Sequence, residues 1–253
     1  MSLTFQTFIP ISNVHFDLAP ASYAQSRIWL DEQIRLDPSN PLVAIYNIPF
    51  VYRLQSQQTF SVKQLQHALQ LLVTKHLSLR TALIFNEQNN ELIQRIMSIN
   101  EDRRAQLFPI VQSTFETEQQ LTHIMHNEKR NSQLFDLAQG LVFRCHIVHY
   151  KQIPPTDLIS HKDLIIFNFH HATFDYPSMH IFLTDLNQAY TTGQLSADNG
   201  KSLRYLDCNY QQSFSCAESF FSLSLLCRCC DRTRNANDWR KHVLVGCVAW
   251  LQS

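Results

Sequence analysis

Residues 164–175 read Leu-Ile-Ile-Phe-Asn-Phe-His-His-Ala-Thr-Phe-Asp, and this stretch carries most of what the sequence says about the fold. The uninterrupted apolar run at its start predicts a strand that is buried on both faces of a sheet. His170 and His171 come at the end of that strand. Because neighbouring side chains of a strand point to opposite faces, we expect one histidine to face a cavity and the other to be held by the core.

The chemistry of this stretch points to proton transfer. Histidine is the side chain best suited to move a proton near neutral pH, and an acyl transfer needs a positioned, deprotonated nucleophile. Asp175 requires a partner if it is buried, and Arg80, at a helix-to-strand transition, is the candidate for a bidentate pair. Two other interpretations stay open. The pair of histidines could be structural, or His170, His171 and Asp175 could bind a metal, although adjacent strand residues diverge and no HExxH motif occurs.

Composition excludes several classes of protein. The chain has 253 residues, 45% hydrophobic and 17% charged, which is typical of a globular protein. Lys+Arg and Asp+Glu are both 21, so bulk charge favours neither nucleic acid nor acidic membranes as a partner. With four glycines, the chain contains no Gly-rich phosphate-binding motif. No leader segment and no apolar stretch of membrane length is recognised, so we expect a soluble, cytoplasmic protein.

Hydrophobic periodicity predicts alternating strands and helices. Ser22 is the expected N-cap of a first helix, Ser61 opens an amphipathic helix ending near His76, and the helix at 117–131 has Glu128 at the spacing of its apolar residues. A further helix is expected at 178–190. Strands are expected at 42–54, 80–86, 91–97, 107–113, 141–150 and 164–169. The mixed order predicts the α/β or α+β class.

The pattern His-His-x-x-x-Asp after an apolar strand resembles the signature of the condensation domains of nonribosomal peptide synthetases. Three more segments agree with that family, in its order along the chain. They are residues 22–29 (SYAQSRIW, similar to SxAQxRxW), 75–81 (KHLSLRT, similar to [RK]HxxLRT) and 135–144 (FDLAQGLVFR, similar to FDLxxGPLFR). The string Tyr46-Asn47-Ile48-Pro49 is also common in the family.

The resemblance implies a chloramphenicol acetyltransferase-like fold, in which two similar lobes form a V with the active site between them. This chain is expected to supply the amino-terminal lobe, a two-layer α+β sandwich with a mixed sheet packed by helices. The family's reaction joins a carrier-bound acyl thioester to an acceptor amine. It implies His171 as the catalytic residue, with His170, Asp175 and its ion-pair partner Arg80 in supporting roles. The expected partners are acyl or peptidyl carrier proteins, which bring the phosphopantetheine arm, and adjacent synthetase domains; no resident cofactor or metal is expected.

The sequence departs from the family pattern in two places. The family's Gly after the motif Asp is replaced by Tyr176, followed by Pro177, which is expected to reshape the substrate channel. The resemblance also ends near Asp207, without the beginning of a second lobe. We therefore expect an extension at 1–14, the lobe at 15–207, and a divergent tail at 208–253 outside the fold.

The tail is rich in cysteine, whereas Cys145 stands alone in the first 200 residues and is expected to be a buried, inert thiol. A small metal knuckle is the rival interpretation of the tail, although the cysteine spacing does not match paired CxxC motifs. Its ligands would be Cys227, Cys229, Cys230, His242 and Cys247. Three functions stay open: an acyltransferase lobe, a catalytically silent lobe that binds a carrier protein, and a truncated product without activity.

Overall fold

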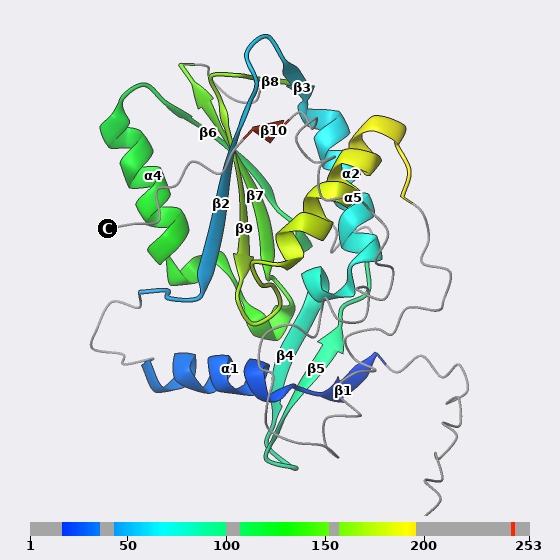
Figure 1. Cartoon of the computed structure of the whole chain (residues 1–253). Coiled ribbons are helices and arrows are strands. Elements are labelled where there is room, and N and C mark those ends of the chain that lie inside the picture. Colours follow the sequence, from blue (N-terminus) through cyan, green and yellow to red (C-terminus); the bar gives the residue numbers. More distant parts are fainter. Residues whose placement is uncertain (1–16, 36–42, 100–106, 152–156, 196–243, 246–253) are drawn as a thin grey trace, which may run out of the picture.

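A five-stranded sheet lies at the centre of the molecule. The structure is a computed structural model, and it describes residues 17–35, 43–99, 107–151, 157–195 and 244–245. The strand order is β10-β2-β9-β7-β6 (Figure 1). The strands are Leu244–Val245 (β10), Asn47–Leu54 (β2), Leu164–His170 (β9), Phe143–Tyr150 (β7) and Ile110–Phe115 (β6). β6 runs parallel to β7 and the other neighbours pair antiparallel, which confirms the expected mixed sheet.

Helices cover both faces of this sheet. The helices α2 (Val62–Lys75) and α5 (Ser178–Thr192) lie on one face, and α4 (Glu118–Arg130) lies on the other (Figure 1). The side chains of β9 alternate accordingly. Ile165, Phe167 and Phe169 join the core under α2 and α5, whereas Leu164 and Ile166 pack with Leu121 of α4. The strand is thus buried on both faces, as predicted, and α4 adds a layer to the two that were expected.

Smaller elements flank the central sheet. A three-stranded sheet has the order β1-β5-β4, and β3 pairs with β8. Their bounds are Leu18–Pro20 (β1), Thr59–Ser61 (β3), Thr81–Asn86 (β4), Glu91–Ile96 (β5) and Leu158–Ser160 (β8). The helix α1 spans Tyr23–Arg35, and single 3₁₀ turns span Leu77–Arg80 (η1), Ser132–Leu134 (η2) and Leu137–Gln139 (η3). The three-residue strands were not predicted, because so short a segment shows no measurable periodicity.

Side-chain caps explain why the helices begin where the sequence predicted. The Ser22 Oγ accepts from the backbone N–H of Gln25 at 3.2 Å, and the Gln25 side chain accepts from the backbone N–H of Ser22 at 2.9 Å. Ser61 caps α2 by accepting from Gln64 N–H at 3.3 Å, and Thr117 and Gln120 form a reciprocal capping box at α4. Each cap satisfies backbone donors that the first helical turn leaves unpaired.

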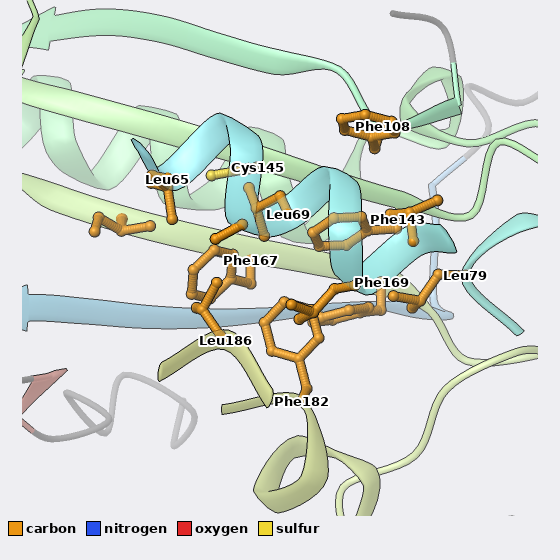
Figure 2. Close-up of a cluster of buried hydrophobic side chains, with 14 of the residues drawn as sticks. Leu65, Leu69, Leu79, Phe108, Phe143, Cys145, Phe167, Phe169, Phe182 and Leu186 are labelled. Carbon is orange, nitrogen blue, oxygen red and sulfur yellow. The ribbon is translucent and has the colours of Figure 1, made fainter. Parts of the chain in front are cut away.

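The core between the sheet and α2/α5 combines aliphatic side chains with a cluster of phenylalanines. Figure 2 shows Phe143 of β7, Phe167 and Phe169 of β9, and Phe182 of α5 gathered below α2. The rings of Phe143 and Phe169 stack with centroids 4.9 Å apart, and Phe182 meets Phe169 edge-on at 5.2 Å. Cys145 lies in the same core, fully buried, and burial raises the pKa of its thiol. The expected buried thiol is confirmed, and the raised pKa leaves little of the reactive thiolate.

The predicted tail lies almost wholly outside the described residues. Two of its residues form β10, where Leu244 is paired with Leu54 and Val245 with Arg53 at the edge of the sheet. The proposed metal knuckle falls on residues outside the described part, and the boundaries at 14 and 207 stay predictions. Among the helices that the structure describes, none is long and apolar enough to cross a membrane.

Candidate active site

His170 is the buried member of the histidine pair. It is the last residue of β9, and it is 3% exposed. Its Nδ1 accepts a hydrogen bond from the backbone N–H of Ala172 at 3.2 Å, and its Nε2 lies 2.9 Å from the Glu32 Oε1 of α1. The ring of Phe135 meets it edge-on, with centroids 5.8 Å apart. Since Nδ1 is an acceptor, the neutral ring carries its proton on Nε2 and donates it to Glu32.

His171 is half-buried, and its Nδ1 faces an acceptor rather than a donor, unlike the Nδ1 of His170. Its backbone N–H donates to the carbonyl of Tyr46 at 2.9 Å, and its Nδ1 lies 3.0 Å from the carbonyl oxygen of Phe174. A carbonyl can only accept, so Nδ1 carries the proton and the neutral ring has its lone pair on Nε2. This is the tautomer in which Nε2 can take up a proton. His170 is thus held by the core, as expected, and His171 is less buried; that His171 faces a cavity stays a prediction.

Phe174 ties the orientation of His171 to the core. Its ring stacks on Phe169 with centroids 3.7 Å apart and an interplanar angle of 8°. Its residue is 6% exposed, and its carbonyl is the acceptor for His171. In the turn between β9 and α5, the side chain of Phe174 thus lies in the core, and its backbone carbonyl orients the ring of His171.

Asp175 closes the turn into α5. Its Oδ1 accepts from the backbone N–H of Ser178 at 3.0 Å and from the hydroxyl of the same residue. Pro177, the N-cap position of α5, makes no side-chain cap bond, so Asp175 supplies the acceptor for the first turn. The carboxylate supports the loop that carries His171.

The expected ion pair between Arg80 and Asp175 is wrong. The structure records no such pair, although it describes both residues. The Arg80 guanidinium instead donates to the carbonyl of Val73 at 3.2 Å and to the carbonyl of Met97. The last turn of α2 leaves carbonyls without helical partners, and Arg80 follows that turn closely enough to satisfy one of them. Burial lowers the pKa of Arg80.

Tyr46 contacts both histidines. Its ring centroid lies 6.3 Å from each imidazole, and its carbonyl accepts from His171 N–H. Its hydroxyl donates to the Asp31 Oδ2 at 2.9 Å, and Arg35 pairs with the same oxygen at 2.8 Å. The hydrogen bond from Arg35 lowers the pKa of Asp31, whereas desolvation and then Asp31 raise the pKa of Tyr46. The motif containing Tyr46 therefore belongs to the site, which sequence reasoning did not assign.

Tyr176 stands where the family has glycine. It is 58% exposed, and its ring centroid lies 5.0 Å from that of Phe50. The aromatic side chain partly packs on the edge of the core and partly projects from the turn after His171. It adds bulk at a position where the family pattern has none.

A second polar cluster lies on the α4 side of the sheet. The fully buried Glu128 is 2.7 Å from His146 Nδ1, 3.2 Å from Arg144 and 2.8 Å from the amide of Asn168. The Ser113 hydroxyl lies 2.7 Å from His146 Nε2. Burial by itself opposes ionisation of Glu128, but its hydrogen bond with His146 and the charge of Arg144 outweigh burial and lower its pKa. The signal for this cluster was Glu128 at an apolar position of the predicted helix.

Metal binding has no support in the described part of the chain. There, no group of three or more His, Cys, Asp or Glu side chains could hold a metal ion. In the structure, the side chains of His170, His171 and Asp175 turn to three different partners. The first ring turns to Glu32, the second to the carbonyl of Phe174, and the carboxylate to Ser178.

The chain is similar to known proteins of one family. The family model described as "Condensation domain" matches residues 16–215. The chain is 31% identical over 191 residues to a subunit of the linear gramicidin synthase of Brevibacillus parabrevis, covering 74% of this chain and 2% of that protein. It is 26% identical over 222 residues to the hybrid PKS-NRPS synthetase apdA of Emericella nidulans, covering 88% and 5%.

The fold resembles that of solved condensation domains. The structure of the condensation domain from the monacolin K polyketide synthase MokA superposes with a TM-score of 0.54 at 16% identity, covering 78% of this chain and 39% of that one. The match thus spans well under half of that structure and a small fraction of the curated synthetases. Because the family model covers most of the chain, the chain belongs to the condensation-domain family.

Proposed function

We propose that the chain is the amino-terminal lobe of a condensation-type acyltransferase. It would form an amide bond between a carrier-bound acyl thioester and an acceptor amine in nonribosomal peptide synthesis. The observation that carries the proposal is the hydrogen bond between His171 Nδ1 and the carbonyl of Phe174. This bond places the lone pair of the neutral imidazole on Nε2, the nitrogen that a reacting amine would need.

The proposed reaction has one bond made and one broken. The amine nitrogen attacks the thioester carbonyl, the C–N bond forms, and the C–S bond breaks to release the phosphopantetheine thiol. The proton lost by the amine is taken up at His171 Nε2 and passed to the leaving sulfur, so the histidine is unchanged at the end. His170 and Asp175 support the turn that carries His171, whereas Arg80 holds the end of α2, and none of the three touches the reacting atoms.

Carrier proteins and adjacent synthetase domains are the proposed partners. The relatives are named as a linear gramicidin synthase subunit and a hybrid PKS-NRPS synthetase. The resemblance to condensation domains implies substrates that arrive on phosphopantetheine arms. The arm enters as substrate, so the lobe needs no resident cofactor.

A catalytically silent lobe that binds a carrier is the second candidate. Tyr176 favours it, because a bulky side chain stands next to Asp175 where the family pattern has glycine. An aromatic ring there would obstruct a substrate that approaches the turn closely, while leaving the outer surfaces of the lobe unaffected.

One experiment separates the two candidates. The purified chain is incubated with an acyl-loaded carrier protein and an amine, and the amide is measured by mass spectrometry. We expect the amide with wild type and with His180→Ala, an exposed histidine on α5, and its loss with His171→Ala. If wild type and His171→Ala are equally inert while both still bind the carrier in a titration, the silent lobe is the correct function.

A further inference from the structure

The helix α1 reaches the histidine pair through two consecutive carboxylates. Glu32 accepts from His170 at 2.9 Å, and Asp31 accepts from the hydroxyl of Tyr46, whose carbonyl holds the backbone of His171. In Figure 1, α1 crosses the end of the sheet where β9 finishes. The helix that begins within the first motif and the histidine motif, far apart in sequence, are therefore in direct contact.

The ring of His170 is one link in the turn that carries His171. Its Nδ1 takes the backbone N–H of Ala172 at 3.2 Å, and its carbonyl accepts from Thr173 N–H at 3.1 Å and from the Thr173 hydroxyl at 3.3 Å. His171 lies between these anchoring points. Any reorientation of the His170 ring would release the Ala172 N–H and loosen the peptide units on both sides of His171.

Only one tautomer of His170 permits this arrangement. If the proton sat on Nδ1, two N–H donors, those of His170 and Ala172, would face each other, and Nε2 would face the Glu32 carboxylate with a lone pair. Both contacts would become repulsive. A carboxylate at Nε2 selects the opposite tautomer, in the way that a buried aspartate orients the histidine of a serine protease triad.

We propose that Glu32 is a positioning residue: it selects the Nε2–H tautomer of His170 and thereby holds the turn that presents His171. This inference rests on the proposed function for its kinetic consequence, but its structural part does not. Glu32 acts on His171 through the ring of His170 and does not itself contact the substrate.

The structural part is tested by nitrogen NMR of histidine side chains in the full chain. Wild type, Glu32→Gln and Glu32→Ala are compared, because glutamine retains an oxygen that can accept from Nε2 and alanine retains none. We expect His170 as the Nε2–H form in wild type and Glu32→Gln, and a mixture with the Nδ1–H form in Glu32→Ala. Gln33→Ala, an exposed neighbour on α1, serves as the matched control and should match wild type.

The kinetic part uses the amide-forming assay on the same variants. Glu32→Ala should lower kcat about 10-fold to 100-fold with KM nearly unchanged, because a misplaced base slows the chemical step and leaves binding intact. Glu32→Gln should recover most of the loss. An unchanged His170 tautomer in Glu32→Ala overturns the inference whatever the activity. A shifted tautomer in a chain whose wild type makes no amide leaves the positioning role standing and rejects the proposed function instead.

Discussion

The Nδ1 atom of His171 lies 3.0 Å from the carbonyl oxygen of Phe174, three residues further along the same turn. The core fixes the position of this turn, since the ring of Phe174 stacks on Phe169 within the core. The orientation of the half-buried imidazole therefore depends on packing inside the domain. Phe174 thus serves both the orientation of His171 and the packing of the core.

Replacing Phe174 with alanine should destabilise the domain and release His171 together. Removing a buried aromatic side chain costs about 3–5 kcal/mol of unfolding free energy. Urea denaturation followed by circular dichroism measures the loss. Phe85→Ala is the control, because Phe85 also stacks, on Trp29 with centroids 5.3 Å apart, but is 40% exposed, so its loss should cost only about 1 kcal/mol. Equal losses for both variants would contradict the anchoring role of Phe174.

Arg80 and Asp175 should contribute to stability independently. The guanidinium bonds to the carbonyls of Val73 and Met97, whereas the carboxylate bonds to Ser178. A double-mutant cycle with Arg80→Ala and Asp175→Ala should give a coupling energy below about 0.5 kcal/mol, as for residues that share no partner. The free energies come from urea denaturation. A coupling well above about 1 kcal/mol would mean that the two charges do meet.

Glu128 should make the stability of the domain depend on pH in the acid range. Its folded-state pKa is lowered from the ordinary glutamate value of 4.5, so the carboxylate stabilises the fold above that pH. The stabilisation is lost as the pH falls through the lowered pKa. At neutral pH, Glu128→Gln should cost about 3 kcal/mol, because the charge of Arg144 is left without its buried partner.

The pH dependence of the unfolding free energy distinguishes a contribution from the charge of Glu128 from a contribution of its side-chain packing. Urea denaturation at a series of pH values should show the difference between wild type and Glu128→Gln narrowing below pH 4.5, where an ordinary glutamate becomes protonated. Glu116→Gln, at an exposed glutamate before α4, should stay close to wild type throughout. A difference that persists unchanged into strong acid would contradict the lowered pKa.

Gly140 and Gly193 form a matched pair for separating backbone strain from steric clash. Both have a left-handed backbone conformation, with φ of 71° at Gly140 and 68° at Gly193. A Cβ at Gly140 would lie 2.7 Å from Met97 Cγ, whereas a Cβ at Gly193 would meet nothing within 4 Å. Gly193→Ala should therefore cost about 1–2 kcal/mol from strain alone, and Gly140→Ala clearly more. Equal unfolding free energies for the two variants, measured in urea, would show that the turn before β7 relaxes freely.

Cys145 should resist alkylation in the folded protein. Its thiol is fully buried and its pKa is raised. Native treatment with iodoacetamide followed by peptide mapping should leave the Cys145 peptide unmodified, with labelling appearing only in denaturant. The cysteines of the tail are resolved as separate peptides and do not interfere. Rapid native labelling of Cys145 would mean that the sheet opens locally.

Much of the architecture could be predicted because its causes are local. Ser22, Ser61 and Thr117 begin helices through bonds to residues three positions away, and the run from Leu164 shows its burial in its own composition. The divergence of His170 and His171 follows from the alternation of a strand. The short strands β1, β3 and β8 could not be predicted, since three residues carry no periodic signal.

The sequence by itself determined the family, the order of the main helices and strands, and the stretch that holds the histidine pair. Tertiary structure decided which groups meet there. In the folded chain, Arg80 donates to two backbone carbonyls, and Glu32 of α1 contacts His170. The carbonyl of Phe174 lies where it orients the ring of His171. Helix caps and strand alternation depend on neighbours in the chain, whereas these partners are chosen by packing between distant segments and by competition for unpaired backbone groups.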